Sequence, residues 1–245
     1  MKKENNRKIL FIGDIVGKPG RNTVKRILPE IITEEQIDYV FANGENVASG
    51  KGITYEKYCE LKDSGIDYFT SGNHIWNNKD IIPYMQNNKV KILRPANYPI
   101  NTPGIGYVEL ENLVLANLQG RVFMKDDLSD PFNVALNIIE KFPDKPIVID
   151  FHTEATSEKL ALANYLDGKV VAVLGTHTHV QTADEKILPK GTAYISDVGM
   201  TGPDDSVLGI KKDIIIEKFL TQLPQSHKVA SGDCLFNAVV VTIDI

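Results

Sequence analysis

Short apolar runs recur along this chain and alternate with segments of helical pattern, and no other feature of the sequence constrains the fold as strongly. The apolar runs predict strands at residues 8–12, 39–42, 68–70, 107–110, 113–118, 147–151, 170–174, 192–196 and 235–243. The helical patterns predict helices at residues 19–34, 55–63, 79–87, 157–166 and 212–221. Strands and helices that alternate in this way are typical of layered α/β proteins, in which helices cover the faces of a sheet. We therefore expect an α/β fold, with the option of two sheets packed face to face.

The chain length agrees with one domain. A chain of 245 residues can bury roughly 70–75% of the surface that it would expose when unfolded, so its core needs no disulfide bonds. We find no internal repeat, low-complexity tract or linker, and we predict a single domain over residues 1–245. Cys59 and Cys234 form no Cys-x-x-Cys pair, and we interpret them as small buried apolar residues.

We see no targeting or membrane segment in the sequence. Residues 1–7 are polar and basic, and the apolar run that follows covers only residues 9–12. A signal peptide needs an apolar stretch of about 7–15 residues, and a membrane span needs about 20. We expect a cytoplasmic protein that has no membrane partner.

The charge balance bears on the class of substrate. The formal net charge is −5, and no dense run of lysine and arginine stands out. Binding to long duplex nucleic acid requires many phosphates to be neutralised, so we do not expect such a partner. A small anionic substrate that is held by metal ions agrees better with this balance.

Polar residues with metal-binding side chains follow several of the predicted strands. Asp14, Glu45, Asn73, His152 and His177 each come within a few residues of the end of an apolar run. Ligands of α/β proteins collect beyond the carboxyl ends of strands, so these side chains are expected to converge on one edge. This convergence is the main physical argument for a functional site.

Histidine is scarce, and His177 and His179 form a closely spaced pair after Gly175. In an extended segment this spacing places both imidazoles on the same side, within reach of two metal ions about 3.5–4 Å apart. Gly175 would let the backbone turn sharply after the strand. Imidazole is the commonest side-chain ligand for divalent transition metals.

Two further segments supply oxygen ligands. The Glu45 carboxylate can bridge two cations, Asn46 and Asn73 offer amide oxygens, and Asp14 adds a second carboxylate. Two carboxylates leave a pair of divalent cations with a net positive charge, which attracts a phosphodiester and stabilises its transition state. The nitrogen-rich set favours Mn, Fe or Zn over Mg or Ca.

Each of these residues also has a structural interpretation when it is taken alone. Asp14 could shape a turn, Asn46 and Asn73 could be turn residues that tolerate positive φ, and His152 could be a hydrogen-bonded structural histidine. His227 stands in a polar stretch and is expected at the surface. The combination of residues, rather than any single one, supports a metal site.

Three short motifs resemble those of the calcineurin-like metallophosphoesterase superfamily: Gly13-Asp14, Gly72-Asn73-His74 and Gly175-x-His177-x-His179, in this order. Longer stretches are similar to its bacterial YmdB-like branch. These stretches cover residues 43–46, 94–99, 117–121, 150–159, 175–184 and 197–203. The resemblance implies a metallophosphoesterase-type β-sandwich flanked by helices, with a dinuclear metal site at the carboxyl ends of the strands.

The chain departs from the wider superfamily at two positions. A typical member has histidine two residues after the first aspartate, where this chain has Val16, and an aspartate as bridging ligand, where it has Glu45. The resemblance implies that Glu45 bridges and that Asn46 replaces the missing histidine. It assigns one metal to Asp14, Glu45, Asn46 and His179, and the other to Glu45, Asn73, His152 and His177. The spacing of the two histidines does not settle this assignment.

The resemblance also implies a reaction, the hydrolysis of cyclic nucleotide phosphodiesters of the 2′,3′ and 3′,5′ forms with iron or manganese, zinc being a further option. We hypothesise that a hydroxide bridging the metals attacks phosphorus in line. His74 would protonate the departing alkoxide as general acid. The alternative role for His74 is to support the metal ligands.

Other functions stay open at this point. A phosphomonoesterase or a small nuclease would use the same ligands. A regulatory nucleotide- or RNA-linked protein would keep the metals with little turnover, although an intact His74 beside a full ligand set argues against this. We expect a small phosphodiester or cyclic nucleotide as substrate. We also expect a homo-oligomer, whose size the sequence leaves open.

Overall fold

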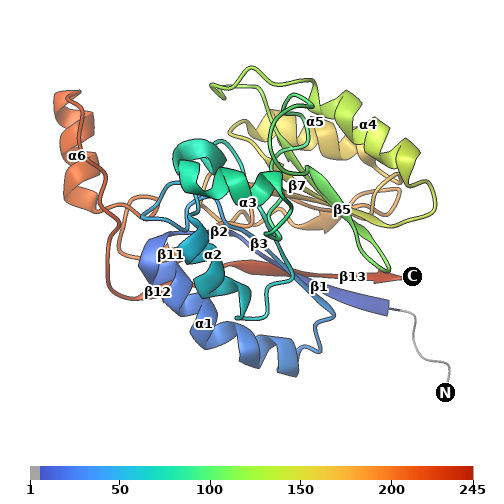
Figure 1. Cartoon of the computed structure of the whole chain (residues 1–245), viewed down its shortest axis with the longest axis horizontal. Helices are drawn as coiled ribbons and strands as arrows, with labels where there is room; N and C mark the ends of the chain where they lie inside the picture. Colours follow the sequence, from blue (N-terminus) through green and yellow to red (C-terminus); the bar gives the residue numbers. More distant parts are fainter. Residues whose placement is uncertain (1–5, 245) are drawn as a thin grey trace.

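Two β-sheets lie at the centre of the fold in the computed structural model, which describes residues 6–244 (Figure 1). The four-stranded sheet has the order β13 (Ala238–Asp244), β1 (Asn6–Ile12), β3 (Tyr39–Asn43) and β4 (Tyr68–Thr70). The six-stranded sheet has the order β5 (Tyr107–Glu109), β6 (Val114–Gln119), β7 (Ile147–His152), β8 (Ala172–Thr176), β10 (Ala193–Ile195) and β9 (Lys186–Ile187). A small third sheet combines β12 (Cys234–Leu235), β11 (Met200–Pro203) and β2 (Asp14–Ile15).

The strand directions bring the carboxyl ends of the inner strands together. β1, β3 and β4 are parallel, and so are β6, β7, β8 and β10. The antiparallel strands β13, β5 and β9 lie at sheet edges. Because parallel strands end at the same edge of a sheet, the loops that follow β3, β4, β7 and β8 can meet at one rim.

The alternating direction of the side chains along β1 explains how the two sheets can pack face to face. Ile9 and Phe11 of β1 pack in one core with Val148 of β7, so this core lies between the sheets. The neighbouring side chains Leu10 and Ile12 point the other way and pack against helices. Successive side chains of a strand alternate between its two faces, so one strand serves both cores.

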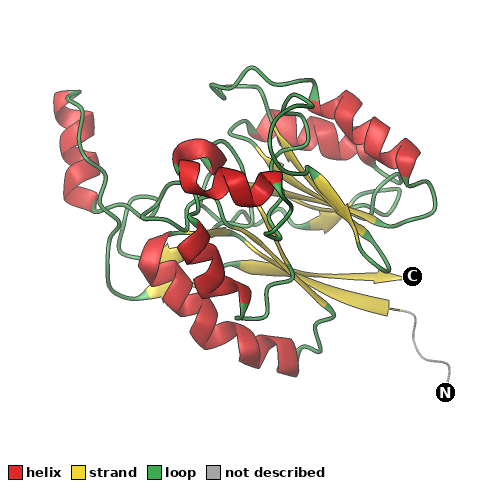
Figure 2. Ribbon diagram, in the orientation of Figure 1, coloured by secondary structure: helices red, strands yellow, loops and turns green. Residues whose placement is uncertain are grey.

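Helices cover the outer faces of both sheets (Figure 2). The core of the four-stranded sheet includes residues of α1 (Gly17–Glu34), α2 (Tyr55–Lys62), α3 (Ile82–Gln86) and the short 3₁₀ helices η1 (Ile75–Asn77) and η2 (Lys79–Ile81). α4 (Pro131–Lys141) and α5 (Thr156–Leu166) pack on the six-stranded sheet. α6 (Lys212–Thr221) buries none of its residues and extends away from the sandwich (Figure 1).

The predicted α/β class is confirmed, and most predicted elements end within two residues of the observed bounds. One exception is the strand predicted at residues 235–243, which is two strands in the structure. β12 pairs with β11 and β13 pairs with β1, so the chain must break between them to change sheets. Cys59 and Cys234 are only partly buried, contrary to our interpretation.

The sequence analysis missed α4, although its beginning carries a clear signal. Asp130 caps the helix by accepting a hydrogen bond from Phe132 N at 3.0 Å, and Pro131 occupies the first turn. Both residue types are favoured at these positions. Within residues 6–244, no helix combines the length and the apolar character that a membrane span needs.

Candidate metal centre

The predicted site residues meet at the rim where the inner strands end. The structure places them at these strand ends: Asp14 in β2, Glu45 and Asn46 after β3, Asn73 and His74 after β4, His152 at the end of β7, and His177 and His179 after β8. Five of them line a pocket with a cavity volume of about 400 Å³, namely Glu45, Asn46, His74, His177 and His179. Asp14 and His152 lie beneath it and are fully buried.

Three potential metal ligands crowd around one nitrogen atom of a fourth, His152. His152 Nε2 lies 3.0 Å from His177 Nδ1, 3.1 Å from Asn73 Oδ1 and 3.2 Å from Glu45 Oε1. The ligand atoms of Glu45, His152 and His177 all lie within 4.8 Å of one another. Carboxylate oxygen, amide oxygen and imidazole nitrogen together form a donor set that suits a divalent transition metal.

Three buried oxygen atoms of the site have no hydrogen-bond partner among the described residues: Asp14 Oδ1, Glu45 Oε1 and Asn46 Oδ1. Glu45 Oε1 lies 3.1 Å from His74 Nδ1 and 3.2 Å from His152 Nε2, but neither contact has the geometry of a hydrogen bond. A buried acceptor without a donor costs about 1–3 kcal/mol. Bound cations would satisfy all three oxygens, so the residues present fit a metal centre.

Hydrogen bonds from the surrounding chain orient two of the side chains. The Asn46 amide nitrogen donates to the Gly50 carbonyl oxygen at 3.0 Å, which leaves its oxygen turned toward the site. His179 Nδ1 lies 3.1 Å from the Leu208 carbonyl oxygen and can only donate to it. The other nitrogen, Nε2, then keeps its lone pair and lies 3.9 Å from Asp14 Oδ1.

The segment that carries the two paired histidines is not extended, so our expectation of an extended segment is wrong. His177 has a φ of 103° and His179 a φ of 65°. Such conformations cost a residue with a side chain about 1–3 kcal/mol. The Asp14 carboxylate accepts from His177 N at 3.1 Å, and the Asp197 carboxylate accepts from Thr178 N at 2.9 Å. These two bonds hold the strained segment in place.

Our expectation that Gly175 lets the backbone turn sharply after the strand is also wrong. Gly175 lies inside β8 and is not among the residues of positive φ. A Cβ atom at this position would overlap the carbonyl oxygen of Ser196, so glycine is needed for close packing of the chain. Gly72 is needed for a similar reason, because a Cβ atom there would overlap the ring of His152.

Burial and neighbouring charges shift the pKa values of the titratable groups at the site. Burial raises the pKa of the Asp14 carboxyl well above its usual value. Burial alone would lower the pKa of His152, but the facing Glu45 carboxylate outweighs it and raises this pKa to about 9. Burial, together with the nearby His152, lowers the pKa of His177 to about 3. Two cations bound between these carboxylates and imidazoles would stabilise their deprotonated forms, so the groups would no longer compete for protons.

Sequence reasoning missed a second group of polar residues that support the site. Thr176 and Asp150 are buried beneath His152, and Lys159 forms a buried ion pair with Asp197 at 2.8 Å. A signal was available, because Asp150 interrupts an apolar run and Thr176 ends another, and both runs form fully buried strands. Buried polar groups are rare unless they are hydrogen-bonded, so their presence points to a network.

Two sheets flanked by helices, with carboxylate and imidazole side chains gathered at the strand ends, define the class of calcineurin-like phosphoesterases. The chain belongs to the YmdB-like protein family within this class, which matches residues 10–245. The resemblance found in the sequence is therefore confirmed.

Individual relatives agree with this assignment. The chain is 50% identical to a Bacillus subtilis protein named 2′,3′-cyclic-nucleotide 2′-phosphodiesterase, over 97% of this chain and 91% of the relative. A crystal structure described as a novel phosphatase from Mycoplasma pneumoniae is 36% identical, with a TM-score of 0.93, over 99% of this chain and 89% of that one. The crystal structure of a hypothetical protein from Thermus thermophilus is 43% identical, with a TM-score of 0.89, over 95% and 92% of the two chains.

Proposed function

We propose that this chain is a dinuclear-metal phosphodiesterase that hydrolyses cyclic nucleotides, with 2′,3′-cyclic nucleotides as the first candidates. The observation that carries the proposal is the crowding of Glu45, Asn73 and His177 around His152 Nε2 at 3.0–3.2 Å. The choice of substrate is supported by the name of the Bacillus subtilis relative.

The broader enzyme class follows from family membership and from this identity of 50%. The chain is a phosphoric diester hydrolase, as the sequence predicted. Its metals, its reaction steps and its preferred nucleotide belong to the proposal.

Two ligand sets would hold the metals. Asp14, Asn46 and His179 would hold one ion, and Asn73, His152 and His177 the other, with Glu45 shared between them. When bound, two divalent cations would lower the pKa of water to about 7 and neutralise charge on the phosphate. Imidazole and carboxylate ligands favour Mn, Fe or Zn.

His74 is the proposed general acid. Its imidazole lines the pocket, and its side chain is 26% exposed, so a substrate can reach it. Glu45 Oε2 accepts from His74 N at 3.1 Å, and His74 Nδ1 lies 3.1 Å from Glu45 Oε1. The first contact fixes the backbone of His74, and the second shows that the ring lies beside a candidate metal ligand, where it can protonate a leaving alkoxide. Such a proton transfer contributes about 10²–10⁴-fold to the rate.

An apolar wall of the pocket suits a nucleoside. Leu208, Ile215 and Phe219 line it, and Phe219 is 71% exposed. An apolar wall beside a centre that attracts anions gives a nucleotide separate contacts for its base and its phosphate. A substrate that consists of phosphate alone would not use this wall.

Metal content and turnover together test the proposal. Protein purified without chelator would be analysed for Mn, Fe and Zn and assayed with adenosine 2′,3′-cyclic phosphate, bis-p-nitrophenyl phosphate and p-nitrophenyl phosphate. We expect about two metals per chain and hydrolysis of both diesters. His177→Ala and Asp14→Ala should lose metal and activity together.

Other results would change the conclusion. Faster hydrolysis of the monoester would favour a phosphomonoesterase, which the description of the Mycoplasma pneumoniae structure makes worth testing. Two metals without turnover would favour the regulatory alternative. Absence of metal under all loading conditions would refute the metal centre.

A further inference from the structure

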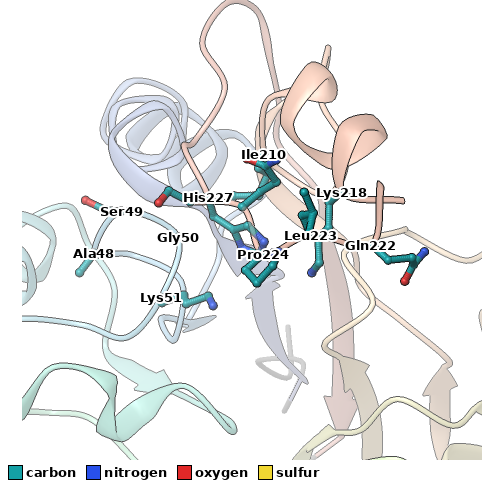
Figure 3. A pocket seen from close by; sticks show the side chains of 12 residues that line it. Ala48, Ser49, Gly50, Lys51, Ile210, Lys218, Gln222, Leu223, Pro224 and His227 are labelled. Atoms are coloured by element: carbon teal, nitrogen blue, oxygen red, sulfur yellow. The ribbon is translucent and has the colours of Figure 1, made fainter. Parts of the chain in front are cut away.

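A second cavity adjoins the pocket of the candidate metal centre. It has a volume of about 780 Å³ and is lined by residues 48–51 and 222–227, together with Ile210 and Lys218 (Figure 3). The two cavities share five lining residues: Gly50, Lys51, Ile210, Lys218 and His227. A ligand can therefore extend from the metal centre into the second cavity.

The two walls of this cavity come from distant parts of the chain. Figure 3 shows the turn that carries Lys51 opposite α6, which carries Lys218, with His227 between them. The turn is fixed by bonds from Lys51 N to the Ala48 carbonyl oxygen at 3.0 Å and from Asn78 Nδ2 to the Lys51 carbonyl oxygen at 2.8 Å. The backbone that presents the Lys51 ammonium is thus anchored.

The titratable residues that line this cavity are all basic, namely Lys51, Lys218 and His227, although the chain as a whole has a net charge of −5. The ion pairs formed within residues 6–244 include neither Lys51 nor Lys218. Burial, and then the positive charges of Lys51 and Lys218, lower the pKa of His227, which agrees with the closeness of the three groups. We call this site the cationic cavity.

We propose that the cationic cavity binds a second phosphate of the substrate, attached to the 5′ oxygen of the nucleotide whose cyclic phosphate lies at the metal centre. This inference rests on the proposed function, because it takes the metal centre as the place of the reacting phosphate. Lys51 and Lys218 would bind the second phosphate by charge, and His227 would donate a hydrogen bond to it.

The chemistry of a nucleotide explains this choice of ligand. The 2′ and 3′ oxygens and the 5′ oxygen leave the ribose in different directions, so a phosphate on the 5′ oxygen points away from the reacting one. A cyclic nucleotide without that phosphate would leave two ammonium groups unused. Two substrates share this chemistry: a mononucleotide with a 5′-phosphate and the 3′ end of an oligoribonucleotide.

The test compares three substrates of the metal-loaded enzyme: adenosine 2′,3′-cyclic phosphate, its 5′-phosphorylated form, and the dinucleotide ApA with a 2′,3′-cyclic phosphate end. We expect kcat/KM to be about fivefold higher for at least one of the two longer substrates, as one partly exposed charged contact allows. The double variant Lys51→Gln/Lys218→Gln should lose this preference for the longer substrates. Lys89→Gln, an exposed lysine outside both cavities, should keep it.

A binding measurement separates this inference from the proposed function. Calorimetry would compare adenosine 3′,5′-bisphosphate with adenosine 3′-monophosphate, and the wild type should bind the bisphosphate about fivefold more tightly. If no cyclic phosphate is hydrolysed but this preference holds, the proposed function fails and the cationic cavity stands. Equal affinities, or equal kcat/KM for the three substrates, would overturn the cavity as a phosphate site. A preference for the 5′-phosphorylated mononucleotide alone or for the dinucleotide alone would support the site and identify which of the two substrates it binds.

Discussion

At the scale of single residues, the hydroxyl group of Thr176 keeps a proton on Nδ1 of His152. Thr176 Oγ1 donates its hydrogen to Asp150 Oδ1 at 2.7 Å, so it can only accept from His152 Nδ1 at 2.9 Å. His152 Nε2 is then the nitrogen that would lose its proton and bind a metal ion. Partners of this kind fix the tautomer and the orientation of metal-binding histidines.

Thr176→Val should therefore weaken metal binding, because the valine cannot accept the proton of His152 Nδ1. Loss of such a partner typically costs about 10–100-fold in metal affinity. Competition with a fluorescent chelator would measure the change. Thr176→Ser keeps the hydroxyl and should retain near wild-type affinity; an equal loss in both variants would contradict the tautomer role.

The proposed acid role of His74 makes a prediction about leaving groups. In His74→Asn, kcat for adenosine 2′,3′-cyclic phosphate should fall about 10²–10⁴-fold, because the ribose alkoxide needs a proton to depart. The kcat for bis-p-nitrophenyl phosphate should fall much less, because p-nitrophenolate leaves without taking up a proton. Equal losses on both substrates, with metal content unchanged, would instead assign His74 to support of the ligands.

At the scale of elements, a buried ammonium group ties α5 to the end of β8 and to the segment that follows. Lys159 Nζ donates to the Thr176 carbonyl oxygen at 2.9 Å and to Asp197 Oδ2 at 2.8 Å. The same carboxylate holds the backbone of Thr178. The strained histidine segment thus depends on a charge pair whose two side chains are each 1% exposed.

Lys159→Met should destabilise the protein because it leaves the Asp197 carboxylate buried and unpaired. Breaking a buried pair from one side costs about 3–5 kcal/mol, which corresponds to a fall in Tm of about 10 °C for a chain of this size. Thermal unfolding would measure it. The double variant Lys159→Met/Asp197→Asn should recover part of the loss. Lys212→Met, which removes an exposed pair with Asp205, should change Tm by less than about 2 °C.

At the scale of the whole molecule, the candidate metal centre gathers residues from all three sheets. Asp14 belongs to the small sheet, Glu45 and Asn73 follow strands of the four-stranded sheet, and His152 and His177 come from the six-stranded sheet. Ligands on one ion that come from different sheets resist their separation. Metal binding should therefore act on global stability as well as on activity.

Removal of the metals should lower the Tm for unfolding of the whole protein. A ligand at a hundredfold excess over its Kd stabilises the native state by about 2.7 kcal/mol, which corresponds to a shift of about 5–10 °C here. Differential scanning calorimetry of chelator-treated protein, before and after the addition of Mn²⁺, would measure this shift. His177→Ala should show a smaller response to Mn²⁺, and a Tm that is independent of metal in the wild type would refute the coupling.

The sequence by itself determined the order and type of most elements and the residues at the ends of the strands. Hydrophobic periodicity and turn residues are local signals, so the strands at 39–42 and 68–70 and the helix at 212–221 could be located without the fold. The same local reading placed Asp14, Glu45 and His152 at strand ends. Family resemblance then supplied the proposed ligand sets, which spacing alone left open.

Only the tertiary structure decided which groups meet. The positive φ of His177 depends on bonds to Asp14 and Asp197, and the tautomer of His152 depends on Thr176. Likewise, Lys51 and Lys218 line one cavity although most of the chain separates them in sequence. Such contacts arise from the packing of whole layers, and a local pattern of side chains contains no information on distances between distant segments.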